Sequence, residues 1–146
     1  MRPSLRVGHR AEVSITVTLE MCPAFDGVVV HRVYSTWSMA HHMELAARKV
    51  LAPHLEAEEE GIGAHLSIDH VAPAPVGVLV RVTAEAVELD ASTLVCTVEA
   101  HRMDASGPVL VGRGRQVQRV LPRRKLDALF ARAGLHDDPA SGKGEA

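Results

Sequence analysis

Residues 35–55 read STWSMAHHMELAARKVLAPHL and form the stretch that predicts a long helix. Ser35, Thr36 and Ser38 can each cap its beginning with a side-chain oxygen. Pro53 lacks a backbone N–H and predicts where the helix ends. Apolar side chains recur at steps of three and four residues, as one helical face requires; they are Met39, Met43, Ala46, Ala47, Val50 and Leu51.

The segments around this helix alternate between apolar and polar residues with period two, which is typical of half-buried strands. Because strands and helices do not alternate along the chain, a doubly wound parallel sheet is disfavoured. The sequence instead predicts an α+β fold in which an antiparallel sheet wraps around one long helix. One helix cannot cover both edges of such a sheet, so we expect a homodimer. The predicted strands cover residues 13–19, 64–70, 78–89, 93–103 and 109–121.

Two connections are predicted from turn residues and charge. Residues 21–34 contain the turn signals Cys22-Pro23 and Asp26-Gly27, and we expect a loop there with a brief strand at Val28–Val30. Residues 56–63 are acidic and end in Gly-Ile-Gly, which predicts a solvated connection between the helix and the next strand.

The end of the chain has a different composition from the rest. Residues 123–133 predict a short basic helix, and residues 134–146 are rich in Gly, Ser and Asp. Such a polar terminal segment is typical of disorder. The chain is therefore predicted to contain one domain, residues 1–133, followed by a disordered tail.

Composition limits the classes of partner. The net charge of −2 implies no general attraction to nucleic acid, and no apolar run approaches the roughly 20 residues that cross a bilayer. Cys22 and Cys96 do not make a disulfide framework, and no export signal precedes them, so we expect a cytoplasmic protein. Neither cysteine has a zinc-like spacing to another ligand, and adjacent helical residues such as His41 and His42 diverge too far to share one ion. No metal and no cofactor are expected.

Three polar residues stand where the pattern expects apolar or neutral ones. Thr36 lies at the predicted start of the helix, Glu44 lies at the edge of its apolar face, and His70 shares a strand face with Leu66 and Ile68. A histidine can take a proton from a hydroxyl or a water, a carboxylate can orient it, and a hydroxyl can attack or hold water. The N–H groups at the helix start could stabilise an oxyanion. Together these residues suggest hydrolysis.

Each of these residues also has a simple structural interpretation. Thr36 could be only a cap, His70 a hydrogen-bonded core histidine, and Glu44 a side chain that reaches solvent. If Thr36 and Glu44 are both helical, the rise between them is about 12 Å, so they cannot touch. In that case either His70 bridges them or a second subunit contributes, and the sequence alone leaves this open.

Three arginines and one glycine are candidates for ligand recognition. Arg113, Arg115 and Arg119 alternate on one face of the last strand, where a guanidinium could pair with phosphate or carboxylate, or simply face solvent. Gly63 could be a turn glycine, or it could let a ligand approach the backbone closely.

Taken in chain order, these residues resemble the fluoroacetyl-CoA thioesterase group of hotdog-fold acyl-CoA thioesterases. The spacing Thr36-x7-Glu44 and the spacing Gly63-x6-His70 both match that group's pattern. The resemblance covers roughly residues 5–126 and includes three further segments: LAPHL at 51–55, HVAPAPVG at 70–77 and GRGRQVQR at 112–119.

The resemblance implies a hotdog fold that works as a dimer, with sites at the subunit interface. It implies thioester hydrolysis with Thr36, Glu44 and His70 as the catalytic set, supported by Gly63 and Arg119. The expected substrate is a small or medium acyl-CoA, or an acyl group on a carrier protein. Coenzyme A is then part of the substrate.

Two other functions stay open at this point. One is a hotdog hydratase or dehydratase, although strand alternation puts Asp69 and His70 on opposite faces, so this acid–base pair cannot share a site. The other is a non-catalytic module that binds an acyl thioester and has no need of His70.

Overall fold

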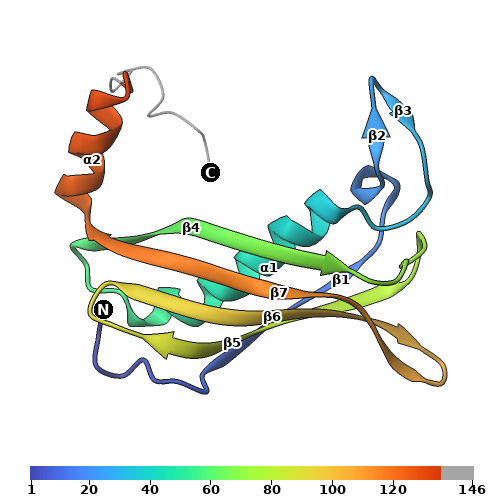
Figure 1. Cartoon of the computed structure of the whole chain (residues 1–146), viewed down its shortest axis with the longest axis horizontal. Helices are drawn as coiled ribbons and strands as arrows, with labels where there is room; N and C mark the ends of the chain where they lie inside the picture. Colours follow the sequence, from blue (N-terminus) through green and yellow to red (C-terminus); the bar gives the residue numbers. More distant parts are fainter. Residues whose placement is uncertain (136–146) are drawn as a thin grey trace, which may run out of the picture.

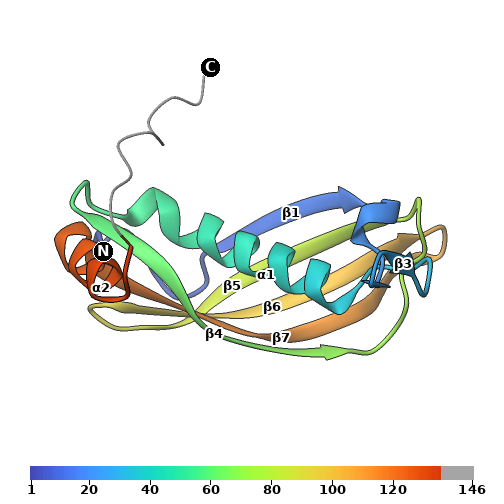
Figure 2. The same ribbon diagram turned by 90° about the horizontal axis from the view of Figure 1, so that it is seen from above.

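The computed structural model describes residues 1–135, in which one long helix lies along one face of a five-stranded antiparallel sheet (Figure 1). Figure 2 shows the sheet curving around this helix. The helix α1 spans Thr36–Leu51, and the strand order is β1-β5-β6-β7-β4. The predicted α+β fold is therefore confirmed. The strand bounds are β1 Arg10–Thr16, β4 Glu59–His70, β5 Leu79–Leu89, β6 Thr93–Asp104 and β7 Gly107–Pro122.

The predicted apolar face of α1 forms the centre of the core. Five of its six residues are completely buried, and Val50 is 3% exposed. Burying a Leu or Met side chain of this size contributes about 1.5–3 kcal/mol. The helix packs on the inward-facing side chains of the two central strands β5 and β6, which are Val80, Val82, Ala84, Ala86, Leu94, Cys96, Val98 and Ala100.

The ends of α1 follow from its capping residues. Ser35 is extended, and its side-chain oxygen accepts a hydrogen bond from the Ser38 N–H at 3.1 Å. This satisfies one of the donors that a helix start leaves free. The α-helix ends at Leu51, and a 3₁₀ turn spans Ala52–His54 with Pro53 inside it. Proline therefore ends the helix as predicted, slightly before residue 55.

Strand β4 begins earlier than predicted. Residues 59–63 were expected to belong to a solvated connection, but they pair in register with β7. Acidic residues and glycines concealed the strand, because neither is typical of strands. The two glycines fit there because α1 approaches closely: a Cβ on Gly61 would lie 2.5 Å from the Leu51 side chain, and one on Gly63 would lie 2.0 Å from Glu44.

The first strand differs from the prediction as well. Strand β1 begins at Arg10 and ends at Thr16, whereas alternation predicted a strand over 13–19. Leu19 lies in a 3₁₀ turn, Leu19–Met21, and is 46% exposed. The alternation of apolar residues thus continues past the point where the chain leaves the sheet.

The two ends of the molecule carry small elements (Figure 1). A hairpin of β2 (Ala24–Phe25) and β3 (Val28–Val29) projects at the end where α1 begins, and β3 is the brief strand that was predicted. At the other end lies α2, which spans Arg123–Arg132 and confirms the predicted basic helix.

The predicted disordered tail, residues 134–146, lies outside the described residues except for Gly134 and Leu135. Within residues 1–135, no helix has the length and apolar character needed to span a bilayer. The two cysteines, Cys22 and Cys96, are both buried and unbonded, and burial raises the pKa of the Cys96 thiol to about 12.

Candidate active site

Thr36 and His70 meet at the start of α1. The Thr36 hydroxyl oxygen lies 2.9 Å from Nδ1 of the His70 ring, which is a hydrogen-bonding distance. Thr36 is the first residue of α1, and His70 is the last residue of β4. His70 lies on the strand face that looks toward the helix, as the alternation of Leu66, Ile68 and His70 predicted.

The backbone fixes the two segments that carry this pair. The Tyr34 N–H, two residues before Thr36, donates to the Ala74 carbonyl at 2.8 Å, and Val33 forms an isolated bridge with Pro75. On the other side, the Ser35 N–H donates to the Met21 carbonyl at 2.8 Å. The chain that enters α1 is therefore tied to the loop that leaves β4, which holds Thr36 against His70.

Glu44 lies two turns further along α1, over Gly63. A Cβ on Gly63 would be 2.0 Å from Oε1 of Glu44 and 2.9 Å from its carboxyl carbon. No real side chain tolerates such contacts, so Gly63 is what lets the carboxylate lie directly against strand β4. Glu44 itself is exposed in the single chain.

A single chain does not bring Glu44 and His70 together. Both Thr36 and Glu44 are helical, and the eight residue steps from one to the other rise about 12 Å. Gly63 and His70 are seven residues apart on β4, which is about 23 Å in an extended strand. Within one chain the predicted set therefore divides into a Thr36–His70 pair and a separate Glu44–Gly63 contact.

Arg119 lies on the opposite face of the sheet. Gly112, Gln116 and Gln118 face α1, since Gly112 contacts Met39 and the two glutamines are buried. Arg119 alternates with them and is exposed next to Thr93 and Ile62 of the neighbouring strands. One chain does not place this arginine near the Thr36–His70 pair, and its role in binding stays a prediction.

A buried tyrosine–histidine pair lies behind the start of α1. The Tyr34 hydroxyl is 2.6 Å from Nδ1 of His42; Tyr34 is completely buried and His42 is 8% exposed. Burial raises the pKa of Tyr34 and, together with the neighbouring His41, lowers the pKa of His42. His41 is exposed, so the two adjacent histidines do point in different directions. The sequence analysis missed this pair because its members are eight residues apart across a helix start.

Exposed apolar side chains lie next to Thr36 and on the adjoining β2–β3 hairpin. Trp37 is 47% exposed, and its ring meets Phe25 of the β2–β3 hairpin edge to face, with ring centroids 5.6 Å apart. Val28 and Val30 of the same hairpin region are 65% and 51% exposed. An apolar surface of this kind next to a polar pair is typical of a site that receives an apolar ligand.

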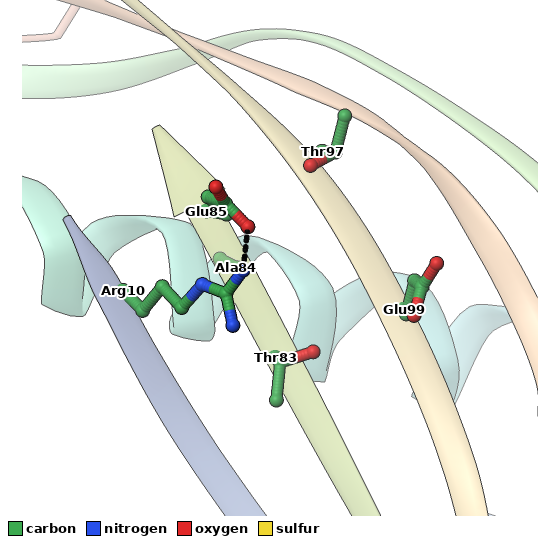
Figure 3. A pocket seen from close by; sticks show the side chains of 6 residues that line it. All are labelled: Arg10, Thr83, Ala84, Glu85, Thr97 and Glu99. Carbon is green, nitrogen blue, oxygen red and sulfur yellow. Dashed lines mark ion pairs between the residues drawn. The ribbon is translucent and has the colours of Figure 1, made fainter. Parts of the chain in front are cut away.

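A hollow in the described part of the chain lies away from the predicted site residues. It has a volume of about 260 Å³ and opens on the sheet face away from α1, where Arg10 and Glu85 form an ion pair beside Thr83, Thr97 and Glu99 (Figure 3). Exposed, paired charges on a sheet face are typical of a solvated surface. None of the predicted site residues lines this hollow.

Two comparisons with known proteins identify the family of the chain. The model of the fluoroacetyl-CoA-specific thioesterase (FlK) family matches residues 17–124. The fluoroacetyl-CoA thioesterase of Streptantibioticus cattleyicolor is 32% identical over 96 residues, which is 66% of the length of each protein. The matched region includes Thr36, Glu44, Gly63, His70 and Arg119.

Solved structures show the same fold. A thioesterase superfamily member from Thermus thermophilus has a TM-score of 0.85 and 41% identity, covering 92% of this chain and 96% of its own. The fluoroacetyl-CoA thioesterase FlK has a TM-score of 0.77 and 27% identity, covering 88% and 97%. Variants of FlK have been solved with acetyl-CoA and with fluoroacetate and CoA.

A hot-dog-like protein from Thermanaerovibrio acidaminovorans has a TM-score of 0.78 and 19% identity, covering 93% of this chain and 96% of its own. At this identity the likeness shows the fold alone. With a family model that spans most of the sheet and the helix, the chain belongs to the fluoroacetyl-CoA-specific thioesterase family, a family of hotdog-fold thioesterases.

Proposed function

We propose that this protein hydrolyses small or medium acyl-CoA thioesters, or acyl groups on a carrier protein, with Thr36, Glu44 and His70 as its catalytic set. The observation that carries the proposal is the 2.9 Å contact between the Thr36 hydroxyl and His70 Nδ1 at the start of α1. A hydroxyl held against an imidazole is the arrangement that nucleophilic or water-mediated acyl transfer needs.

Each group has a role in that reaction. His70 takes a proton as general base, either from the Thr36 hydroxyl, which then attacks the thioester carbon, or from a water that Thr36 holds. The C–S bond breaks, and the thiolate of coenzyme A leaves with the proton that His70 had taken. If Thr36 has attacked, a water that gives its proton to His70 then hydrolyses the acyl ester on Thr36 and restores the hydroxyl. The N–H groups of Thr36 and Trp37 lie in the first helical turn and have no acceptor within the helix, so they are available to stabilise the oxyanion.

The third member of the set comes from a second subunit in this proposal. Strand β4 is an edge of the sheet and pairs with β7 on one side only. Two copies can pair β4 to β4 in antiparallel fashion, and partners in such a ladder are equidistant from its centre. With the irregularity between Gly63 and His65 counted as one extra residue, a centre at Ser67 matches inward-facing positions and puts Gly63 opposite the second copy's His70. Glu44, which lies over Gly63, then approaches that imidazole and can orient it.

The apolar surface around Thr36 supports a hydrocarbon acyl group in the substrate. Trp37, Phe25 and the hairpin valines present an apolar surface to it beside the helix start. Gly63 and Arg119 would support substrate binding. Arg119 would do so from a second copy or by contacting the coenzyme A part of the substrate. The proposed reaction needs no metal and no cofactor, and we propose that it takes place in the cytoplasm.

A released-thiol assay tests the proposal. Purified protein is given acyl-CoAs from two to eight carbons, fluoroacetyl-CoA included. We expect turnover of at least one of them, and a loss of about 10²–10⁴-fold in rate for His70→Ala. Failure of the wild type to hydrolyse any of them, combined with a ligand-induced rise in melting temperature, would favour the binding module instead.

Thr36 has two possible roles, which a second measurement separates. If Thr36 is acylated, quenched reactions analysed by mass spectrometry carry the acyl mass on the peptide that contains Thr36. If Thr36 only holds water, no acylated peptide accumulates.

A further inference from the structure

Two glutamine side chains are buried on the helix side of β7. Gln116 and Gln118 are each 1% exposed. The Gln116 amide N–H donates to the Val117 carbonyl at 3.2 Å. Within residues 1–135, Gln116 Oε1 and Gln118 Nε2 are buried side-chain atoms that lack a hydrogen-bond partner. A buried amide atom without a hydrogen-bond partner lowers the stability of the fold.

Gln118 lies beside the Glu44–Gly63 contact. Gly63 is its direct partner across the β4–β7 ladder. A Cβ on Gly61, two residues earlier, would lie 3.5 Å from Oε1 of Gln118, so the amide extends over β4. A Cβ on Gly63 would meet Glu44 at 2.0 Å. Leu51 fills most of the space above Gly61, with the Gln118 amide oxygen at its edge, and the Glu44 carboxylate fills the adjoining space above Gly63.

The separation of the two groups follows from strand geometry. Directly opposite positions of an antiparallel pair have Cβ atoms about 4.5–5.5 Å apart. Gly63 and Gln118 are such a pair. The Glu44 carboxylate lies over Gly63, and the Gln118 side chain begins at the position opposite. Among the described residues Nε2 of Gln118 has no hydrogen-bond partner, and a rotation of the exposed Glu44 side chain can bring the carboxylate to it.

The nearest cation on the helix is engaged elsewhere. Arg48, one turn after Glu44, donates to the Glu60 carboxylate at 2.7 Å and to the Gly61 carbonyl at 3.1 Å. Glu44 therefore has Gln118 as the polar donor on the sheet beneath it. A carboxylate with several rotatable bonds needs such a donor if it is to keep one orientation.

We propose that Gln118 is a positioning residue whose Nε2 donates to the Glu44 carboxylate once the Glu44 side chain turns toward it. One carboxylate oxygen is then fixed against the sheet, and the other is free to orient the imidazole of the second copy. This inference rests on the proposed function and adds a residue to it that neither the resemblance nor the helix pattern identified.

Gln118→Met tests the inference, because methionine has nearly the same shape and no N–H donor. We expect kcat to fall about 10- to 100-fold with KM within about twofold, since misplacing a reacting group acts on the chemical step. Gln116→Met is the matched control: it removes an equally buried amide two residues away, and kcat should stay within about twofold of the wild type. Gln118→Asn keeps an amide but shortens its reach, and should lower kcat in the same direction.

A double variant separates positioning from packing. If Gln118 acts through Glu44, then Gln118→Met adds no further loss to Glu44→Gln, because coupled residues are not additive. Full kcat in Gln118→Met, an equal loss in Gln116→Met, or an additive loss in the double variant would each overturn the inference. If the wild type hydrolyses no acyl-CoA, the proposed function itself is wrong. This result differs from the three outcomes above, which all require an active wild type.

Discussion

At the scale of single residues, glycines decide where the polar groups of the site can lie. Gly63 and Gly61 are on the same strand and face the same helix, but they make room for different side chains. Gly63 adjoins the exposed Glu44 carboxylate, and Gly61 adjoins the completely buried Leu51. The same Gly→Ala substitution should therefore have a functional effect at one position and a structural effect at the other.

We expect Gly63→Ala to displace the Glu44 carboxylate and lower kcat by about tenfold or more, with little loss of stability, because an exposed side chain can move away. Gly61→Ala forces a methyl group against Leu51 in the core and should lower the free energy of unfolding by about 1–3 kcal/mol. Chemical denaturation and the thiol assay on both variants check this. Equal effects of the two substitutions on stability would contradict the assignment of Glu44 to this contact.

His42 gives the protein a pH-dependent stability. Burial and the neighbouring His41 lower the pKa of His42, so the unfolded chain binds a proton at a higher pH than the folded protein does. As pH falls below about 6.5, the reference pKa of histidine, protonation stabilises the unfolded state more than the folded state. The free energy of unfolding therefore decreases.

His42→Gln keeps an acceptor for the Tyr34 hydroxyl but does not titrate. We expect its free energy of unfolding to fall less than that of the wild type between pH 7.5 and 5.5, as measured by urea denaturation. His31→Gln, at an exposed histidine, should keep the wild-type pH dependence. An identical pH dependence in wild type and His42→Gln would show that His42 does not contribute.

At the scale of elements, the close approach of β4 to β7 depends on a glycine, Gly114. A Cβ on Gly114 would lie 1.8 Å from the Ser67 carbonyl oxygen of β4. Backbone cannot move aside as a flexible side chain can. We expect Gly114→Ala to lower the free energy of unfolding by about 3 kcal/mol. Circular dichroism during thermal unfolding checks this, with Gly63→Ala as the control that should keep a near-native melting temperature.

The sequence predicted these elements unevenly, for physical reasons. The helix was clear because six apolar residues keep one face over four turns and a serine and a proline mark its ends. The start of β4 was not predicted, because Glu59, Gly61 and Gly63 are individually poor strand residues. The approach of α1 explains the two glycines, and Glu59 forms an ion pair with the N-terminal amine. The buried glutamines were also visible in principle, since they alternate with the arginines of β7, but alternation alone does not say which set faces the helix.

The candidate site was predictable only in part. The contact between Thr36 and His70 follows from a helix start and an inward-facing strand position, both of which the sequence indicates. The contact of Glu44 with Gly63 could not be predicted, because it depends on how α1 crosses the sheet edge. The proposed meeting of Glu44 with a second copy's His70 depends on a surface that one chain's pattern does not describe.

At the scale of the whole molecule, β4 is a paired strand on one side and an open edge on the other. Open edges invite pairing with another strand. We expect sedimentation to give a mass of twice 15.7 kDa at micromolar concentration. Leu66→Pro, near the proposed centre of the β4–β4 contact, should shift the mass toward that of a monomer and lower the thioesterase rate with it. A fully active monomer would contradict a shared site.

The most direct test is the thiol-release rate of a mixed dimer, co-expressed with two different tags, in which one subunit carries Glu44→Ala and the other His70→Ala. If each site takes Glu44 from one subunit and the Thr36–His70 pair from the other, one of the two sites in the mixed dimer is intact. The account then predicts about half the wild-type rate, although each variant is nearly inactive as a homodimer. A mixed dimer no more active than its two parents would contradict it.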